Sequence, residues 1–447
     1  MATGKPIRIQ RWFWPAVLLL PALTAISIAL TWKFSALPEA RIVGPSMAPA
    51  LLGKHGEVAC DDCQFAFQFD LEETPLSERL ICPNCGRLQA STDNVRVEAG
   101  DRVPIDAEIL QSRAPRRFDL VAFSLPEEPE KLAVKRVIGV PGDRVAIRQG
   151  ELYINDKLLR KSLVEQQQLG VLVNDNQFRA RSQPQVASHW RPDEADTSWR
   201  NVRGADGPYQ FVQLPTNPAP ANSRWNWLSY HPQLSFDTPA NDPPSLLDND
   251  AYNQTLARPL NDVFDYRLCA RIGLDHSPEF AIRAHDGWRS WLMEVSLTAG
   301  VATLTCEGEP PQTVPLGIQL DRSRGWVDLE FSLVDEQCLC ALDGQVIFQT
   351  EIARGKTPRA LPIPFLSLAG RAGQAIEVSQ LRVYRDIYYL DPVGLSQPWT
   401  TGPTLGPDEY FVLGDNAPVS TDSRQFGPIL RAAMRGLVRP PVRTPHP

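Results

Sequence analysis

The stretch "LAVKRVIGVPGD", residues 132–143, contains the pattern on which the interpretation of this sequence depends. Aliphatic residues surround Lys135, and a Pro-Gly-Asp turn at 141–143 closes the run, so a β-strand is expected to end there. Because side chains alternate along a strand, Arg136 should point to the face opposite Lys135. A lysine in such a strand is either an edge residue whose ammonium reaches water or a base kept neutral by apolar surroundings.

Short stretches elsewhere also predict strands, bounded by turn residues at close intervals. "FDLVAF" (118–123) and "EYFVL" (409–413) each predict one strand, and "RVAIRQGELYI" (144–154) predicts two strands separated by a Gln-Gly turn.

The chain has 447 residues with 41 prolines, a composition that fits β structure and loops better than long helices. Its formal net charge of −7 argues against a nucleic-acid-binding surface.

A long interruption, about residues 183–386, separates these strands, and from about 251 it has a regular pattern. In "WVDLEFSLVD" (326–335) apolar and polar residues alternate, and Asp343-Gly344 lies between two apolar runs, which is a strong hairpin signal. Several strands at short spacing predict a β-sandwich, and the pattern resembles jelly-roll sandwiches of the concanavalin or laminin-G type.

An apolar segment precedes all of this. Trp12–Trp32 is 21 residues long and uncharged, which is enough to cross a bilayer as a helix. Three basic residues precede it and the first acidic residue is Glu39, so the N-terminus is expected in the cytoplasm and the remainder outside. A cleaved signal peptide is the alternative, but the apolar run exceeds the usual 7–15 residues of such a peptide. The sequence therefore predicts a single-pass anchor in the cell membrane.

Four cysteines are spaced as in a zinc ribbon. Cys60, Cys63, Cys82 and Cys85 form the pattern C-x2-C-x18-C-x2-C, in which each CxxC turn directs two thiolates at one metal. Four thiolates leave no open position, so a zinc ion there would be structural; two disulfides are the alternative in an oxidising compartment. The remaining four cysteines, Cys269, Cys306, Cys338 and Cys340, are expected to be small residues of the sandwich core or an incidental pair.

A serine follows the apolar segment in "RIVGPSMAPALL" (41–52), where Gly44-Pro45 presents Ser46 on a turn. Serine is a poor nucleophile until a neighbouring base takes its proton. Lysine can serve as that base when burial lowers its pKa from about 10.4.

Four segments together carry a family resemblance. "GPSMAPAL", "RRFDLVAF", "VKRVIGVPGD" and "GDNAPVSTDSRQFG" occur in this order behind the expected anchor. This combination resembles bacterial signal peptidase I, the membrane-bound Ser/Lys protease family that removes signal peptides from exported proteins. The resemblance covers about 1–58, 96–175 and 395–440, and the ribbon and the sandwich are insertions relative to short family members.

The resemblance implies roles for individual residues. Ser46 would be the nucleophile, Lys135 its general base, and Ser420 would hydrogen-bond the lysine amine. Asp415 would pair with Arg136, and Asp422 with Arg424, to brace the strands around the dyad.

The resemblance also implies the details of the reaction. The backbone N–H of Ser46 would serve the oxyanion hole. Some family members add a hydroxyl two residues before the nucleophile, where this chain has Gly44. Catalysis would need no cofactor, and the substrates would be preproteins with small side chains before the cut. Residues 41–44 and 132–135 are expected to line shallow apolar pockets by pairing with the extended substrate.

The predicted fold is therefore mainly β, with a signal-peptidase-type core behind one transmembrane helix. We divide the chain into the N-terminus and anchor (1–40), a catalytic β domain (41–58, 95–182 and 387–447), a zinc ribbon (59–94) and a β-sandwich (183–386). The expected partners are preproteins and the lipid bilayer, with no nucleic acid.

Two alternatives remain at this point. A self-cleaving repressor would also use a Ser/Lys dyad, but it would carry a DNA-binding module in place of an anchor. A catalytically inactive, membrane-tethered protein would use the sandwich to bind carbohydrate or protein, with Trp288, Trp291 or Trp326 as stacking platforms. Core packing is the simpler explanation for these tryptophans.

Overall fold

The computed structural model describes fourteen stretches of the chain, namely residues 38–71, 80–89, 94–125, 128–182, 188–193, 198–203, 209–214, 224–232, 246–275, 278–318, 320–357, 359–393, 395 and 397–441. The predicted membrane anchor, Trp12–Trp32, lies outside these residues. Within them, no helix has the length and apolar character needed to cross a bilayer. The described part is mainly β, as the sequence predicts.

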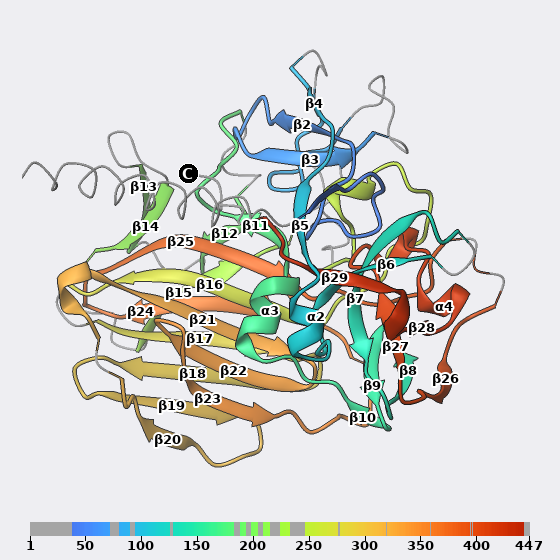
Figure 1. Ribbon diagram of the computed structural model, residues 1–447. Helices are drawn as coiled ribbons and strands as arrows, with labels where there is room; N and C mark the ends of the chain where they lie inside the picture. The colour runs from blue at the N-terminus through green and yellow to red at the C-terminus, as the bar shows by residue number, and fades with distance from the viewer. Residues whose placement is uncertain are drawn as a thin grey trace, which may run out of the picture.

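Two antiparallel sheets form what we call the small β domain (Figure 1). The larger sheet has the strand order β1 (Glu39–Arg41), β5 (Arg102–Asp106), β29 (Met434–Val438), β6 (Leu120–Ser124), β7 (Leu132–Gly139), β27 (Glu409–Leu413) and β28 (Ile429–Leu430). The smaller sheet has the order β10 (Lys157–Leu158), β9 (Glu151–Ile154), β8 (Arg144–Arg148) and β26 (Thr401–Thr404). Short helices connect these strands: α2 (Ile109–Ser112), η3 (Ala417–Val419), α4 (Ser423–Phe426) and η4 (Arg431–Ala433).

The predicted hairpin at 144–154 is confirmed. β8 and β9 pair antiparallel around Gln149 and Gly150, which both have positive φ, the geometry of a two-residue turn that matches strand twist. Ile138 on β7 and Leu413 on β27 share one apolar cluster with Val145 and Ile147 on β8. The smaller sheet therefore packs against one face of the larger sheet.

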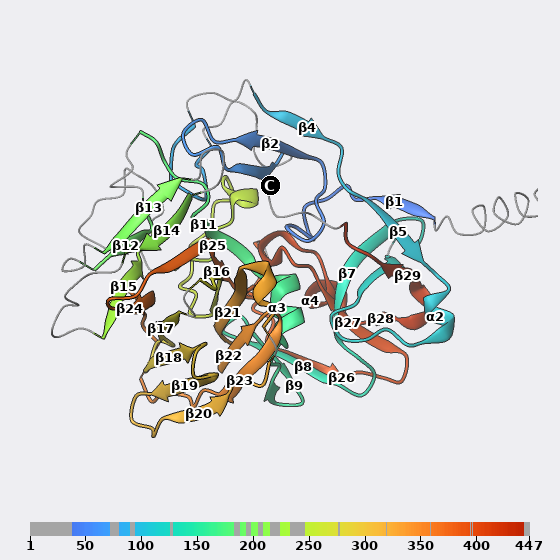
Figure 2. The same ribbon diagram turned by 90° about the vertical axis from the view of Figure 1, so that its left-hand side faces the viewer.

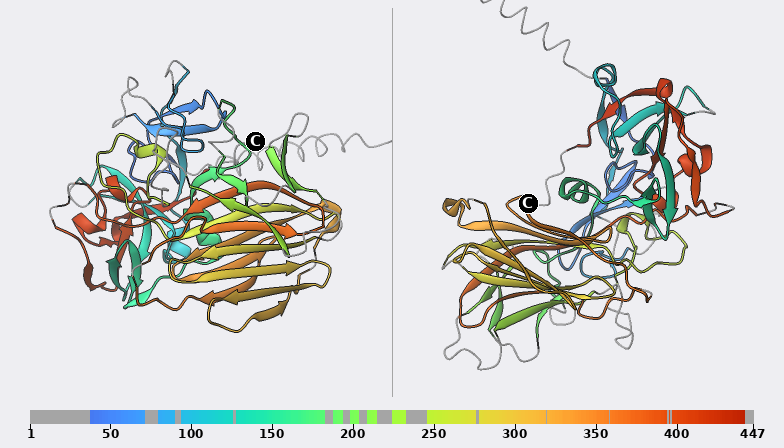
Figure 3. Two further views of the ribbon diagram at one scale, coloured as in Figure 1. Left: turned by 180° about the vertical axis from the view of Figure 1, so that it is seen from behind. Right: turned by 90° about the horizontal axis from the view of Figure 1, so that it is seen from below.

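Two further antiparallel sheets stack as the predicted β-sandwich (Figure 3). One has the order β13 (Trp199–Arg203), β14 (Tyr209–Gln213), β25 (Ile376–Arg385), β16 (Tyr266–Gly273), β21 (Trp326–Val334), β22 (Gln337–Leu342) and β23 (Gln345–Glu351), with β11 (Val171–Asp175) also paired to β25. The other has the order β12 (Trp190–Pro192), β15 (Trp225–Tyr230), β24 (Leu366–Arg371), β17 (Glu279–His285), β18 (Ser290–Ser296), β19 (Val301–Cys306) and β20 (Gln312–Pro315).

The core of the sandwich follows the alternation in the sequence. Val327, Leu329, Phe331 and Leu333 are all buried in the apolar cluster between the two sheets. Asp343 and Gly344 have positive φ and connect β22 to β23, as the hairpin signal predicts. Cys306, Cys338 and Cys340 are buried and unpaired in this core, and Cys269 is partly exposed.

The sandwich begins earlier in the chain than residue 183. β11 belongs to its first sheet, and helix α3 (Leu163–Leu169) packs against the same sheet through Leu163, which contacts Leu339 and Ala341. Turns η1 (Ala251–Asn253) and η2 (Arg322–Arg324) lie in the loops of the insertion.

A three-stranded sheet carries the four-cysteine segment, which lies beside both the small β domain and the sandwich (Figure 2). Its order is β3 (Ala66–Asp70), β2 (His55–Ala59) and β4 (Arg96–Glu98), so it includes strands on both sides of the predicted ribbon, 59–94. Phe65 contacts Phe178 edge to face at 5.3 Å, and Asp62 accepts hydrogen bonds from the backbone of Arg181 and Ser182. The ribbon is therefore packed onto the start of the sandwich.

Candidate functional site

Ser46 lies on a tight turn at one edge of the small β domain. The turn is closed by a hydrogen bond from the Ala48 N–H to the Pro45 carbonyl at 3.0 Å. The flanking Met47 and Leu51 are buried in a cluster with strand residues, whereas Ser46 itself is partly exposed. The apolar neighbours thus fix the turn, and the hydroxyl stays accessible.

Lys135 on β7 points at this hydroxyl. Its Nζ donates a hydrogen bond to Ser46 Oγ at 2.5 Å, although 89 positions separate the two residues. Only 4% of Lys135 is exposed. The structure thus brings the expected nucleophile and the expected base into direct contact.

Burial of Lys135 changes its chemistry. Desolvation lowers its pKa from the ordinary 10.5 to about 8, and the nearby carboxylates of Asp422 and Asp415 limit that shift. About one lysine in ten is therefore neutral at pH 7 and about half at pH 8. An amine with this pKa can take a proton from a serine near neutral pH.

The loop after β27 closes over the dyad at Gly414. A Cβ on this glycine would lie 2.2 Å from Ser420 Oγ and 2.4 Å from the Ser46 carbonyl oxygen, so no side chain fits between them. Ser420 is 1% exposed, and its Oγ makes no hydrogen bond to any described residue. The expected hydrogen bond from Lys135 to Ser420 is thus not formed here, because the lysine amine is directed at Ser46.

Two buried ion pairs hold the surrounding strands. Arg136 binds Asp415 through both guanidinium arms, with Nε to Oδ1 at 2.7 Å, and it also donates to the Phe118 carbonyl. Arg424 binds Asp422 with Nε to Oδ1 at 2.9 Å and Nη2 to Oδ2 at 2.7 Å. These are the pairs that the resemblance implies, and Arg136 lies opposite Lys135 as strand alternation requires.

Asn416 is a site residue that the sequence analysis did not single out. Its backbone N–H donates to the Ser46 carbonyl at 3.1 Å, and its side-chain amide donates to the Pro45 carbonyl at 3.1 Å. It lies in the "GDN" segment that follows β27, and that position was its only signal in the sequence.

The Ser46 backbone N–H is free to bind an oxyanion, since it donates to none of the described residues. At Gly44, where some family members carry a hydroxyl, an added Cβ would meet nothing within 4 Å. A serine side chain therefore fits at this position.

The four ribbon cysteines surround one point. Cys60 Sγ lies 3.7 Å from Cys85 Sγ, Cys63 Sγ lies 3.7 Å from Cys82 Sγ, and all four sulfurs are within 4.8 Å of one another. All four are buried free thiols. Disulfide sulfurs would be about 2.0 Å apart, whereas tetrahedral ligands 2.3 Å from a metal are about 3.8 Å apart. The cluster has the geometry of a metal site and not of two disulfides.

A second group of carboxylates lies where the small β domain meets the sandwich. Glu151, Asp335 and Asp386 approach one another, but Lys161 Nζ lies among them, 2.6 Å from Asp335 and 2.9 Å from Asp386. The ammonium therefore takes the place that a cation would fill, and we interpret this group as an ion-pair network.

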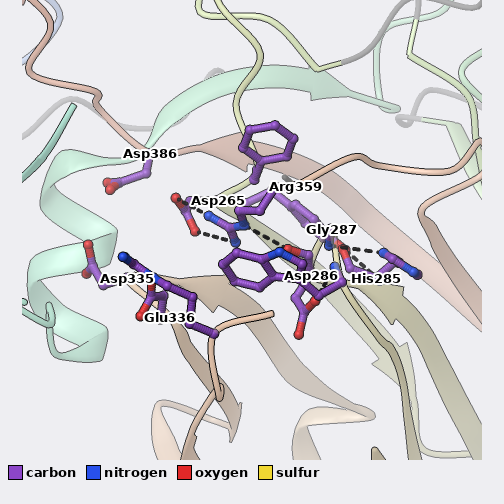
Figure 4. A network of polar contacts seen from close by, with 12 residues as sticks. Asp265, His285, Asp286, Gly287, Asp335, Glu336, Arg359 and Asp386 are labelled. Atoms are coloured by element: carbon purple, nitrogen blue, oxygen red, sulfur yellow. Dashed lines mark hydrogen bonds and ion pairs between the residues drawn. The ribbon is translucent and has the colours of Figure 1, made fainter. Parts of the chain in front are cut away.

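The network continues into the sandwich. Arg359 binds Asp265 and donates to the Asp286 carbonyl, as the close view shows beside Asp335 and Asp386 (Figure 4). Burial raises the pKa of Asp335 to about 7 even with Lys161 beside it. Charged residues of the small β domain and of the sandwich thus meet in one buried network.

The tryptophans considered as stacking platforms are largely covered. Trp291 is 2% exposed, and Trp288 packs between Arg359 and the backbone of Gly355. Trp326 is 37% exposed and stacks on Arg271. The structure favours packing roles for Trp288 and Trp291.

Comparison with known proteins, like the contact between Ser46 and Lys135, is consistent with a peptidase site. Residues 79–194 and 368–442 match the family described as "Signal peptidase, peptidase S26". This chain is similar to signal peptidases. The matched ranges include Lys135 and residues 415–424 but leave out Ser46, whose place in the site comes from the geometry.

Signal peptidase I of Pseudomonas aeruginosa is 37% identical over 67 residues, and that of Rickettsia massiliae is 34% identical over 64 residues. Each match covers 14% of this chain, and the chain spans only 24% of either relative's length.

Solved structures similar to part of this chain include carbohydrate binding module CBM66 from Bacillus subtilis and sheep galectin-11. The first has a TM-score of 0.25 and 8% identity, covering 44% of this chain and 96% of the module. The second has a TM-score of 0.20 and 12% identity, covering 27% of this chain and 89% of the galectin. Similarity at these TM-scores is too low to indicate a ligand.

Proposed function

We propose that this protein is a serine endopeptidase that cleaves N-terminal signal peptides from exported preproteins with a Ser46–Lys135 dyad. The single observation that carries the proposal is the 2.5 Å contact between Ser46 Oγ and the buried Lys135 Nζ. A serine and a desolvated lysine form the minimal pair for acyl transfer without histidine. The match to the signal peptidase family supports signal-peptide-bearing preproteins as the substrate class.

The reaction begins with neutral Lys135, which takes the proton of Ser46 as the oxygen attacks the scissile carbonyl. The Ser46 N–H stabilises the negative charge on the carbonyl oxygen of the tetrahedral intermediate. Lys135 then gives its proton to the leaving amine, and an acyl-enzyme remains. Neutral again, Lys135 takes a proton from a water molecule as the water oxygen attacks the ester carbonyl. The bond between that carbonyl carbon and Ser46 Oγ then breaks, Lys135 returns the proton to Ser46 Oγ, and the signal peptide leaves with a free carboxylate.

The substrate is an extended peptide next to β7. β7 pairs with β27 through Arg136, Val137 and Gly139, so residues 132–135 have β6 as their partner on one side only, within the described part of the chain. Leu132 is 51% exposed and Val43 is 66% exposed. This free edge and these apolar side chains suit a strand with small residues before the cut.

The ribbon holds a structural zinc ion in this proposal. Cys60, Cys63, Cys82 and Cys85 would be its four ligands, and the metal would supply folding energy to a segment too short to bury much core. Zinc takes no part in catalysis, because the four thiolates leave no open position.

The segment Trp12–Trp32 would anchor the chain in the cell membrane, with the catalytic domain on the outer side.

The experiment is cleavage of a preprotein panel by the purified chain, with mass spectrometry of the new N-termini. Cuts are expected after small residues such as Ala-X-Ala, and Ser46→Ala and Lys135→Ala should each abolish them. Matched controls are Ser290→Ala on the sandwich and Lys131→Ala next to β7, two exposed residues outside the site. Cutting that persists in both dyad variants would refute the proposed function.

A further inference from the structure

Asn253, in the sandwich insertion, makes a reciprocal contact with the loop over the dyad. Its side-chain Nδ2 donates to Asn416 Oδ1 at 2.6 Å, and Asn416 Nδ2 donates back to Asn253 Oδ1 at 3.0 Å. The two residues are 163 positions apart. Asn416 is buried, so this pair satisfies amide atoms that water does not reach.

The turn that presents Asn253 is fixed on three sides. The Asp250 side chain caps η1 by accepting from the Tyr252 N–H at 2.8 Å. Tyr252 packs against Ala48 and Leu52, which follow the nucleophile. The Gln254 side chain accepts from the Ile81 N–H at 2.7 Å and donates to the Ile81 carbonyl at 2.8 Å. Insertion, ribbon and nucleophile turn therefore meet at η1.

Asn416 in turn holds both peptide groups that flank Ser46. Its Nδ2 donates to the Pro45 carbonyl and its backbone N–H donates to the Ser46 carbonyl. The Pro45–Ser46 peptide is trans, so its carbonyl and its N–H point in opposite directions in one plane. A hydrogen bond that fixes the Pro45 carbonyl therefore also fixes the direction of the Ser46 N–H.

We propose that Asn253 is a positioning residue that orients the oxyanion-binding N–H of Ser46 by locking the side-chain amide of Asn416. This inference rests on the proposed function, since it assigns the Ser46 N–H to the tetrahedral intermediate. The sandwich insertion thereby acquires a role in the reaction.

The side-chain amide of Asn416 must be held in one orientation, because its nitrogen donates hydrogen bonds and its oxygen accepts them. The Pro45 carbonyl requires the Nδ2 end, and Asn253 occupies the remaining Nδ2 hydrogen and the Oδ1 atom. Without Asn253, Oδ1 is buried and unpaired, and rotation of the amide would place that oxygen against the Pro45 carbonyl. The rotated amide would no longer hold the peptide plane.

A double-mutant cycle of Asn253→Ala and Asn416→Ala tests the inference, with kcat and KM measured for preprotein cleavage. Asn253→Ala should lower kcat about tenfold and change KM less than about twofold, because the loss falls on the transition state. In the Asn416→Ala background the same change should have less than about a twofold effect, because Asn253 acts only through Asn416. Equal effects in the two backgrounds would overturn the inference. The matched control is Asn261→Ala, an exposed amide of the same insertion bonded to Asp248.

Two further measurements cover other outcomes. A substrate-like peptide aldehyde, which adds the Ser46 oxygen as a hemiacetal, should bind Asn253→Ala about tenfold more weakly than the parent.

If Asn253→Ala does not fold, Asn253→Asp, which keeps an acceptor for Asn416 but loses the donor, replaces it in the cycle. Backbone amide exchange of residues 46–48 should be faster in Asn253→Ala than in Asn261→Ala even if the chain cuts no preprotein. Unchanged exchange would overturn this inference alone, whereas an inactive parent chain would refute the proposed function.

Discussion

Lys135 is the residue whose environment decides the chemistry of the site. Its carbon chain is buried beneath the Ser46 turn, and two carboxylates, Asp415 and Asp422, lie close enough to favour the charged form. Those carboxylates are already paired with Arg136 and Arg424, so their pull on the lysine is partly balanced. Desolvation dominates, and it lowers the pKa of the amine to about 8.

Replacing Lys135 with methionine should stabilise the fold while abolishing cleavage. A pKa of about 8 against 10.5 in the unfolded chain means that burial of the ammonium costs about 3 kcal/mol, offset by about 1 kcal/mol from the hydrogen bond to Ser46. Below pH 8 both states are protonated and the variant gains its full advantage, about 2 kcal/mol. The advantage shrinks between pH 8 and 10.5, where the folded chain releases the proton first.

Urea unfolding of Lys135→Met and its parent at pH 7 and pH 10 measures this difference. Lys131→Met, at an exposed position, is the control and should show no such gain. A Lys135→Met variant less stable than its parent at pH 7 would contradict a desolvated lysine.

Gly44 allows a prediction about gain of function. An added side chain meets no atom within 4 Å there, and the glycine does not have positive φ. Gly44→Ser should therefore fold normally and supply a second oxyanion donor, which raises kcat by up to about tenfold. The measurement is kcat for preprotein cleavage, with Gly44→Ala as the control. Equal rates for the serine and alanine variants would show that the hydroxyl does not reach the oxyanion.

Among the elements, the ribbon is the one whose stability would depend on the proposed zinc ion. Its sheet is only three short strands, and its cluster of cysteines and phenylalanines packs against the start of the sandwich at Ala180 and Phe178. A metal ion bound as proposed would therefore support the contacts that hold η1 and the turn at Ser46.

Cys82→Ser should lower the zinc content from about one ion per chain to near zero and reduce the melting temperature by at least about 5 °C, because a three-thiolate site binds much more weakly. Elemental analysis and thermal unfolding measure the two effects. Cys269→Ser, a partly exposed cysteine of the sandwich, should keep the zinc. Full zinc content in Cys82→Ser would contradict the four-cysteine site.

Local elements were predictable from sequence because their signals are local. The strand 409–413, the Gln149-Gly150 and Asp343-Gly344 hairpins and the alternation in 327–333 all appear as expected. Lys135 and Ser46 were also identifiable, since each lies in a recognisable segment.

Contacts between distant segments could not be predicted in this way. The pairing of β11 with β25, and that of Asn253 with Asn416, join residues more than 160 positions apart. The ion-pair network of Lys161 likewise depends on how the small β domain packs against the sandwich. Ser420 lies beside the dyad as expected, but the hydrogen bond expected between it and Lys135 is formed with Ser46 instead.

At the scale of the whole molecule, the ion-pair network of Lys161 joins the sandwich to the small β domain. Lys161→Met should destabilise the chain by about 3–5 kcal/mol, because it leaves Asp335 and Asp386 buried without their cation. Denaturant unfolding measures this loss, and Lys157→Met, at an exposed position on β10, is the control. A loss below about 1 kcal/mol would mean that the network contributes little to the junction.

The pH dependence of kcat/KM for preprotein cleavage tests whether neutral Lys135 activates Ser46. We expect a rise of about tenfold per pH unit at acidic pH and a plateau above pH 8, where the lysine has lost its proton. A rate that stays constant between pH 6 and pH 9 would contradict it.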